Sequence, residues 1–306
     1  MLRLQDFILL AVIFSSIGAA ILFPALGTPF RAFPLYCMMA LLFLSFLSIP
    51  ARHIWEFVTE SPGFICLALI FKLLALPVAV FFLFHWLLPG YALAALLLTG
   101  ISTGVVSPFF AELVLANAPL VVVTVVTSSL FVPVTLPALV RVLAGSNLEI
   151  PFSAMAQILA LVVFIPFALS ELVKLLSERW TQKILKKRFL ISLAMFAVTN
   201  LGIFSKYSSY FRQQPSDVLT ALAVACVLAA IFFAFGVVFS WKMPIREQLA
   251  VIIDFVLVNN VLVLVFSAHF FTPREPFVAA MYMVPFYFLL IPLRAYQAWR
   301  LRASEQ

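Results

Sequence analysis

The sequence has 306 residues, of which 65% are hydrophobic and only 10% are charged, and its formal net charge is +7. A soluble domain averages about 25% charged residues, so this composition excludes a water-soluble globular protein. The 19 Lys and Arg residues are scattered between apolar runs and form no basic, aromatic-rich face, which argues against a nucleic-acid-binding protein.

Long apolar runs predict an all-α polytopic membrane protein. A helix needs about 20 apolar residues to cross a bilayer, and the short alternating segments that would predict a membrane barrel do not occur in this sequence. The longest run, 91–142, is broken near its middle only by Asn117-Ala118-Pro119, where we divide it into two spans. The sequence therefore predicts about ten transmembrane helices, at residues 6–24, 33–50, 62–87, 90–116, 118–144, 152–176, 188–205, 217–241, 246–270 and 276–297.

The distribution of basic residues predicts how these helices are oriented. A cytoplasmic N-terminus places 13 of the 19 Lys and Arg residues on the cytoplasmic side, together with the C-terminus. The basic segment 174–188 then becomes a solvated cytoplasmic connection. It divides the chain into residues 1–176 and residues 177–306. The first part holds the first five-helix repeat and, from about residue 150, the start of the second repeat, and the second part holds the remainder of the second repeat. Because five is odd, related halves would insert in opposite senses, which is the inverted-repeat plan of many transporters.

Ionisable side chains at bilayer depth are costly and rarely face lipid, so they are candidates for a functional site. Lys72 lies in the middle of the predicted third span, and Asp254 is the matching anion in the ninth. Glu112 lies in the fourth span, but it is equally well placed to reach the membrane interface.

The fourth and ninth predicted spans are also the irregular ones. Segment 100–108 contains two glycines, three hydroxyl residues and a proline, which predicts a broken helix. In the ninth span, Asp254, Asn259 and Asn260 would not share one narrow face of an intact helix, so either the helix unwinds or the three residues contact different neighbours. A polar contact between helices, worth about 1 kcal/mol, would explain single residues. The correspondence of two broken helices favours a substrate site near the midplane.

Several motifs resemble those of the bile acid:sodium symporter family. The segment Thr103-Gly104-Val105-Val106-Ser107-Pro108 stands where that family has its crossover motif, residues 117–145 follow with the spacing of the fifth helix, and residues 254–260 stand at the ninth-helix motif. The resemblance implies a ten-helix carrier with a core domain, a panel domain and crossing helices 4 and 9.

The resemblance also implies altered ion sites. Lys72 stands at a glutamine position of the third helix, Asp254 replaces a longer carboxylate, and Pro108 replaces an asparagine, whereas Ser107 is kept. The fifth-helix hydroxyl positions fall on valines, although hydroxyl residues lie nearby. A buried ammonium at a sodium site would repel the ion, so we hypothesise that Lys72 replaces sodium by pairing with Asp254. Proton coupling through Lys72 stays open.

These observations predict a secondary active transporter of a small organic anion that works by alternating access without sodium. We expect neither a cofactor nor a bound metal, and partners limited to the substrate and the lipid bilayer, with both termini in the cytoplasm and a bacterial inner membrane as the location. A transport-inactive sensor or scaffold and an intramembrane enzyme are the alternatives, and no set of reactive residues favours the enzyme. The predicted substrate and ion site comprises Lys72, Thr103, Ser107, Pro108, Glu112, Thr124, Thr127, Ser128, Asp254, Asn259 and Asn260.

Overall fold

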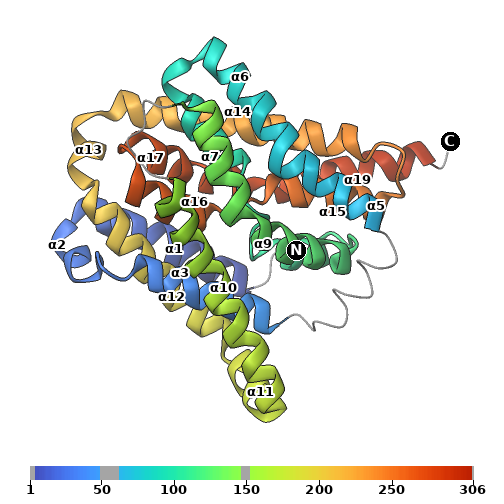
Figure 1. Cartoon of the computed structure of the whole chain (residues 1–306), viewed down its shortest axis with the longest axis horizontal. Helices are drawn as coiled ribbons and strands as arrows, with labels where there is room; N and C mark the ends of the chain where they lie inside the picture. The colour runs from blue at the N-terminus through green and yellow to red at the C-terminus, as the bar shows by residue number, and fades with distance from the viewer. Residues whose placement is uncertain (1–3, 49–61, 146–151, 305–306) are drawn as a thin grey trace. The chain divides into compact units, whose positions relative to one another are not determined.

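The structure is a computed structural model that describes residues 4–48, 62–145 and 152–304. Every named element in these ranges is a helix, and an isolated antiparallel bridge joins Thr103 to Val258 (Figure 1). The all-helical prediction is therefore confirmed for the described residues.

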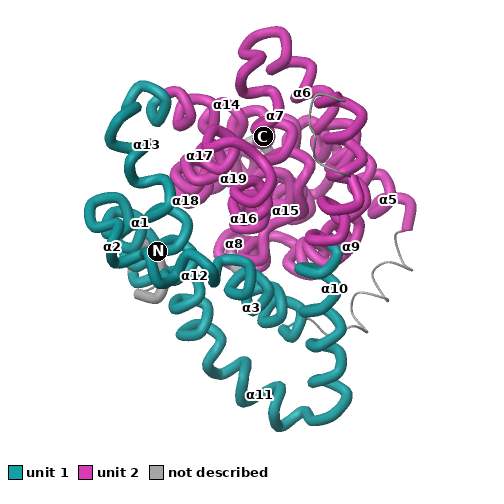
Figure 2. Tube along the Cα trace, turned by 60° about the vertical axis from the view of Figure 1, so that its left-hand side comes forward, with its two compact units in different colours: residues 1–48, 160–219 teal, residues 49–159, 220–306 magenta. Residues whose placement is uncertain are grey.

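The chain forms two compact units, and each unit is built from two separate stretches of sequence (Figure 2). Unit 1 contains residues 1–48 and 160–219, and unit 2 contains residues 49–159 and 220–306. The helices α10 and α14 each begin in one unit and end in the other.

Unit 1 is arranged around α12, which packs against α1, α2 and α3. The first helix ends at Leu22, and the chain turns there by 114° into a short second segment. That segment lies close to α12, because a Cβ atom added to Gly202 would meet the carbonyl oxygen of Phe30 at 2.5 Å. The elements of unit 1 are α1 (Leu4–Leu22), α2 (Pro24–Gly27), η1 (Thr28–Phe30), α3 (Pro34–Leu47), most of α10 (Phe152–Leu176), α11 (Glu178–Lys186), α12 (Arg188–Lys206), α13 (Ser208–Gln213) and the start of α14 (Pro215–Phe239).

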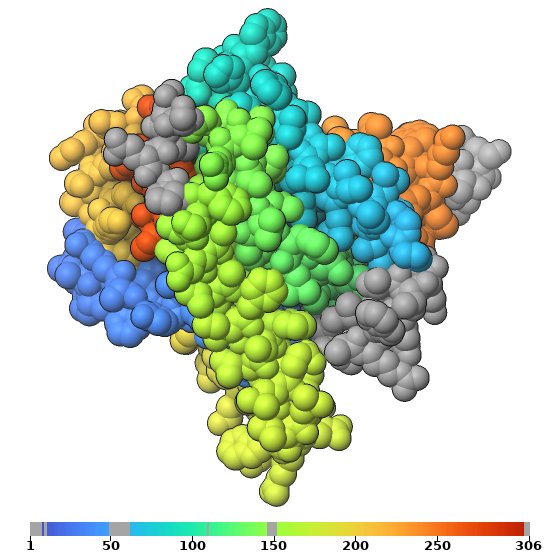
Figure 3. Space-filling view, viewed as in Figure 1, coloured from blue at the N-terminus to red at the C-terminus, as the bar shows by residue number. Residues whose placement is uncertain are grey.

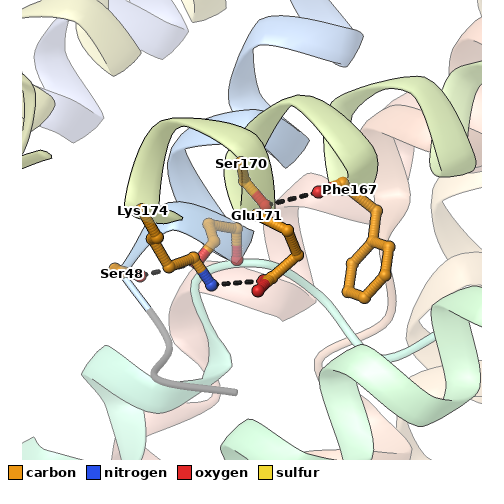
Figure 4. A network of polar contacts seen from close by, with 6 residues as sticks. Ser48, Phe167, Ser170, Glu171 and Lys174 are labelled. Atoms are coloured by element: carbon orange, nitrogen blue, oxygen red, sulfur yellow. Dashed lines mark hydrogen bonds and ion pairs between the residues drawn. The ribbon is translucent and has the colours of Figure 1, made fainter. Parts of the chain in front are cut away.

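Polar contacts gather near the end of α10, where Ser170, Glu171 and Lys174 follow Phe167 along the helix (Figure 4). Lys174 Nζ lies 2.5 Å from a carboxylate oxygen of Glu171, and the Ser170 hydroxyl donates to the Phe167 carbonyl at 2.7 Å. The Phe167 ring meets Phe46 of α3 edge-on, with 5.4 Å between the ring centroids. Within unit 1, α10 is thus held to α3 by aromatic packing.

Unit 2 contains the two predicted irregular spans, and both are interrupted helices. The first interruption separates α7 from α8, and the second separates α15 from α16. The elements of unit 2 are the first residues of α10, α5 (Pro62–Ile70), η2 (Phe71–Ala75), α6 (Leu76–Leu87), η3 (Pro89–Tyr91), α7 (Ala92–Thr99), α8 (Ser107–Leu113), α9 (Ala118–Leu143), the rest of α14, α15 (Ile245–Val256), α16 (Asn260–Phe270), α17 (Arg274–Met281), α18 (Met283–Phe288) and α19 (Leu290–Ser304).

The helices are long and apolar enough for a polytopic membrane protein. In the described residues, five helices could cross a membrane, or up to seven if each of two bent pairs counts as one span. Ten spans and an inverted repeat therefore stay predictions. The predicted division at Asn117 is confirmed, since α8 ends at Leu113 and the Asn117 side chain accepts a hydrogen bond from the Leu120 amide at 3.2 Å as the N-cap of α9.

Candidate functional site

Two interrupted helices of unit 2 meet backbone to backbone. The Gly104 amide donates to the Leu257 carbonyl at 2.5 Å, and the Asn259 amide donates to the Ser102 carbonyl at 2.8 Å. We call the two breaks, residues 100–106 and 257–259, together with the helix ends that flank them, the crossing. Main-chain groups released by a helix break need partners at membrane depth, and here each break supplies some of the partners of the other.

Local sequence explains the first break. A Cβ atom added to Gly104 would lie 2.8 Å from the Val258 carbonyl oxygen and 2.9 Å from that of Leu257, so a side chain at this position would push the two breaks apart. Pro108 stands in the first turn of α8, where a missing amide hydrogen costs no helical bond. Glycine thus permits the contact, and proline starts the helix that follows it.

The carbonyl groups at the end of α15 are occupied by donors from other elements. The Asp254 carbonyl accepts from Lys72 Nζ at 2.6 Å and from the Thr103 hydroxyl at 3.1 Å. The Val256 carbonyl accepts from the Tyr282 hydroxyl at 2.7 Å. The Leu257 carbonyl accepts from the Ser107 hydroxyl at 3.2 Å as well as from the Gly104 amide. These carbonyl oxygens could bind a cation, but each of them already accepts a hydrogen bond from a protein donor.

Lys72 reaches this cluster from a π-helical turn, η2, in the span from Pro62 to Leu87. Pro77 lacks the amide hydrogen that would bond to the Leu73 carbonyl, which accounts for the irregular turn just before it. The Lys72 side chain is only 2% exposed, and its ammonium lies 5.6 Å from the centroid of the Phe255 ring. The negative end of the α15 dipole and the aromatic ring both favour a cation there.

Helix α9 also supplies hydroxyl groups to the crossing. The Ser128 hydroxyl accepts a hydrogen bond from the Thr103 amide at 3.1 Å, and the Thr124 hydroxyl lies beside the Asp254 carboxyl group. Because Thr124 and Ser128 are four residues apart, they lie on one face of α9. The Thr127 hydroxyl instead donates to the Val123 carbonyl of its own helix at 2.7 Å.

Several buried polar atoms at the crossing have no hydrogen-bond partner. Eight such side-chain atoms occur among the described residues, and five of them belong to the crossing. Buried polar groups are almost always paired in folded proteins, so unpaired atoms gathered in one place indicate a ligand, an ion or water. The five atoms are Ser102 Oγ, Asp254 Oδ1, Asn259 Nδ2, Asn260 Nδ2 and Asn260 Oδ1.

The structure corrects one detail of the expected Lys72–Asp254 pair. The two residues do meet, but the ammonium donates to the main-chain carbonyl of Asp254, and among the described residues no carboxylate oxygen lies at ion-pair distance from it. The carboxyl group is still close enough to interact electrostatically with Lys72, and both groups are buried. The ammonium is therefore held by the end of helix α15 rather than by the carboxylate.

The other predicted residues divide into two sets. The structure brings Lys72, Thr103, Ser107, Thr124, Ser128, Asp254, Asn259 and Asn260 to the crossing, with Pro108 next to it. Glu112 does not join them, because α8 carries its side chain to an exposed position. Thr127 is half-buried, and its hydroxyl is used within α9.

Sequence reasoning missed two members of the site. Tyr282 is fully buried between α17 and α18 and donates to the second break. Ser102 lies in the irregular segment and was not singled out, although its hydroxyl is buried without a partner. A tyrosine in an apolar span gives no distinguishing signal, whereas the serine was recognisable from its neighbours Thr103 and Ser107.

Comparison with known proteins gives one family match. The family model described as the Sodium Bile acid symporter family matches residues 34–214, which is more than half of the chain. No curated protein sequence matches the chain. The chain therefore belongs to the sodium bile acid symporter family, whose members are membrane transporters of the bile acid and organic anion type.

Proposed function

We propose that this member of the sodium bile acid symporter family is a secondary transporter of a small organic anion that works by alternating access without sodium. One observation carries the proposal: Lys72 donates a hydrogen bond at 2.6 Å into the carbonyl cluster at the end of α15. A fixed ammonium then supplies the positive charge that a bound sodium ion would otherwise bring.

The occupied carbonyl groups support independence from sodium. A sodium ion needs several oxygen ligands, and the carbonyls of Asp254, Val256 and Leu257 already accept from protein donors. Three oxygen atoms stay unpaired at the crossing, on Ser102, Asp254 and Asn260. An ion bound there would lie in the field of the buried Lys72 ammonium, which repels it.

The unpaired nitrogen atoms support an anionic substrate. Asn259 and Asn260 stand at the N-terminal end of α16, and the Nδ2 atom of each is buried without an acceptor. The positive end of a helix dipole favours an anion, and carboxamide nitrogens can donate hydrogen bonds to its oxygen atoms. A carboxylate or sulfonate would fill those donor positions.

The division into units supports alternating access. The crossing and Lys72 belong entirely to unit 2, so this unit can keep the whole site intact as it moves. In the proposal, unit 2 is the core domain and unit 1 is the panel domain.

The test is uptake into proteoliposomes by the purified full-length protein, with a radiolabelled bile acid and radiolabelled pyruvate as separate probes. Sodium and proton gradients are imposed one at a time, with potassium replacing sodium in the control. We expect saturable uptake and counterflow of at least one probe at equal rates in sodium and in potassium, and a strong loss of uptake with Lys72→Gln.

Two results would contradict the proposal in different ways. Uptake that requires sodium and survives Lys72→Gln would show that Lys72 does not replace the ion. Saturable binding of a probe without counterflow would favour the transport-inactive sensor. Thermal unfolding in sodium and in potassium gives a readout that needs no substrate, and we expect the same midpoint in both salts.

A further inference from the structure

The segment 174–188, which the sequence predicts to be a plain connection, contains a separate short helix between two candidate membrane spans. α10 ends at Leu176 and α12 begins at Arg188, and both helices are long and apolar enough to cross a membrane. Between them, α11 (Glu178–Lys186) is only nine residues long. Because α11 directly joins two candidate spans, it lies close to one surface of the membrane in which those spans are inserted.

Ser177 separates α11 from α10. Its backbone is extended, with φ −164° and ψ 110°, and its hydroxyl accepts a hydrogen bond from the Trp180 amide at 3.3 Å as the N-cap of α11. Helix α10 therefore ends and α11 begins on either side of Ser177, and α11 does not continue the axis of α10.

One face of α11 packs onto unit 1. Thr181 is buried, while Ile184 and Leu185 are half-buried, and this spacing of three and four residues marks one side of a helix. This side contacts α3 and α12, which belong to the same unit. At 100° per residue, Arg179, Lys183 and Lys186 fall on the opposite side.

The outward face is basic and carries an exposed indole ring. Arg179, Lys183, Lys186 and the following Lys187 are all exposed, and among the described residues none of the four has a carboxylate at ion-pair distance. The only acidic residue of α11 is Glu178. Trp180 is 62% exposed, and the Lys183 ammonium lies 5.0 Å from the centroid of its ring.

Exposed leucines border α11 in the sequence on both sides. Leu175 and Leu176 at the end of α10 are 84% and 73% exposed, and Leu190 in the first turn of α12 is 68% exposed. Figure 3 shows α10 and α11, in yellow-green, on the visible face of the molecule. Apolar side chains beside cations and a tryptophan are the composition of a helix that lies in the interface of a membrane.

We propose that α11 lies in the lipid headgroup layer and binds the phosphate groups of anionic phospholipids through Arg179, Lys183, Lys186 and Lys187. Trp180 inserts its ring at the level of the headgroups, where amphipathic rings are favoured, and the bordering leucines face the acyl chains. A soluble acidic partner fits less well, because it would not give the exposed Trp180 ring beside Lys183 the headgroup layer in which amphipathic rings are favoured. The proposal needs only the membrane location of the chain and does not depend on transport.

The experiment measures quenching of Trp180 fluorescence in proteoliposomes made with brominated phosphatidylglycerol or brominated phosphatidylcholine at equal mole fraction. The chain has five tryptophans, so the Trp180 signal is the difference between the wild-type protein and Trp180→Phe. We expect an association constant at least about fivefold higher for the anionic lipid, the factor that one favourable cation supplies. High salt abolishes the preference, because the cations are exposed.

The matched control compares two triple variants. Arg179→Gln/Lys183→Gln/Lys186→Gln removes three cations from α11, and Lys242→Gln/Arg294→Gln/Arg302→Gln removes three exposed cations elsewhere. The first variant loses the preference for phosphatidylglycerol, and the second keeps it. Equal thermal unfolding of the two variants excludes misfolding as the cause.

Either of two results would overturn the proposal. Equal quenching of Trp180 by both brominated lipids would show that the cations do not select anionic headgroups. Strong quenching by aqueous iodide with none by either lipid would place the face in water, where a soluble partner is the occupant.

Discussion

The break between α7 and α8 spans seven residues, whereas the break between α15 and α16 spans only three. The longer break and the first residue of α8 supply donors, namely the Gly104 amide and the hydroxyls of Thr103 and Ser107. The shorter break and the helix end before it supply the carbonyl acceptors. The exception is the Asn259 amide of the shorter break, which donates to the Ser102 carbonyl of the longer one. The negative end of the α15 dipole therefore lies beside the acceptors, and the only buried cation of the crossing lies there too.

This comparison assigns different tasks to the two breaks. The longer one has no titratable side chain, and its small residues allow the close approach of the two main chains. The charge of the site lies beside the shorter one, because Asp254 stands in the last turn of α15 and Lys72 donates to its carbonyl. A substitution in the first break should disturb geometry, and a substitution near the second should disturb charge.

The largest expected effect comes from closing the space at Gly104. Gly104→Ala places a methyl group against two main-chain carbonyls, neither of which can move without breaking the crossing. We expect the free energy of unfolding to fall by about 3 kcal/mol and uptake to be lost. The measurement is unfolding in mixed detergent micelles together with uptake. Gly63→Ala is the control, because an added Cβ atom there meets no neighbour, and equal stability of the two variants would contradict the backbone contact.

Lys72→Met and Asp254→Asn separate the roles of ammonium and carboxylate. Lys72→Met removes a charged donor from the end of α15, and we expect a loss of about 3 kcal/mol. Asp254→Asn keeps the main-chain carbonyl that Lys72 binds, and we expect a loss of about 1 kcal/mol. Unfolding of the two single variants and the double variant measures the coupling. Equal losses in the single variants would show that the carboxylate holds the ammonium.

A smaller effect is expected from the cap of the second break. The Asn259 side chain accepts from the Leu262 amide at 3.3 Å as the N-cap of α16. Asn259→Ala should lower the free energy of unfolding by about 1 kcal/mol, and Asn259→Ser should restore most of it, because serine also caps helices well. Identical unfolding curves for the alanine and serine variants would argue against the cap.

The smallest effect on stability is expected at Asn260. Neither polar atom of its carboxamide has a protein partner, so Asn260→Ala removes no hydrogen bond within the chain. We expect unchanged or slightly higher stability and about tenfold slower uptake, the cost of one hydrogen bond to a charged substrate. Thr127→Val is the control, since the Thr127 hydroxyl is used within its own helix. Equal uptake by both variants would remove Asn260 from the site.

Much of this site was predictable from residue types that disfavour an intact helix. Glycines and a proline in segment 100–108 predicted the first break, and the spacing of Asp254, Asn259 and Asn260 indicated that the ninth span was irregular as well. A lysine in the middle of an apolar run predicted a buried cation, because an ammonium at that depth needs a partner. Each of these signals is local, and the structure contains all of them.

The remaining features depend on contacts that no local pattern records. The partner of Lys72 is a main-chain oxygen, which follows from where α15 ends rather than from the identity of Asp254. Tyr282 looks like any aromatic residue in an apolar span, and its role follows from the bond to Val256. Glu112 was included in the site because it lies in the predicted fourth span, although it was equally well placed to reach the membrane interface. Helix α8 is only seven residues long and leaves it exposed.

The interleaved order of the two units constrains how the chain is made. Residues 1–48 belong to unit 1, but the rest of that unit, 160–219, emerges from the ribosome only after residues 49–159 of unit 2. The N-terminal helices are therefore made more than a hundred residues before α12, against which they pack. A chain released at any point before residue 160 would contain neither unit complete.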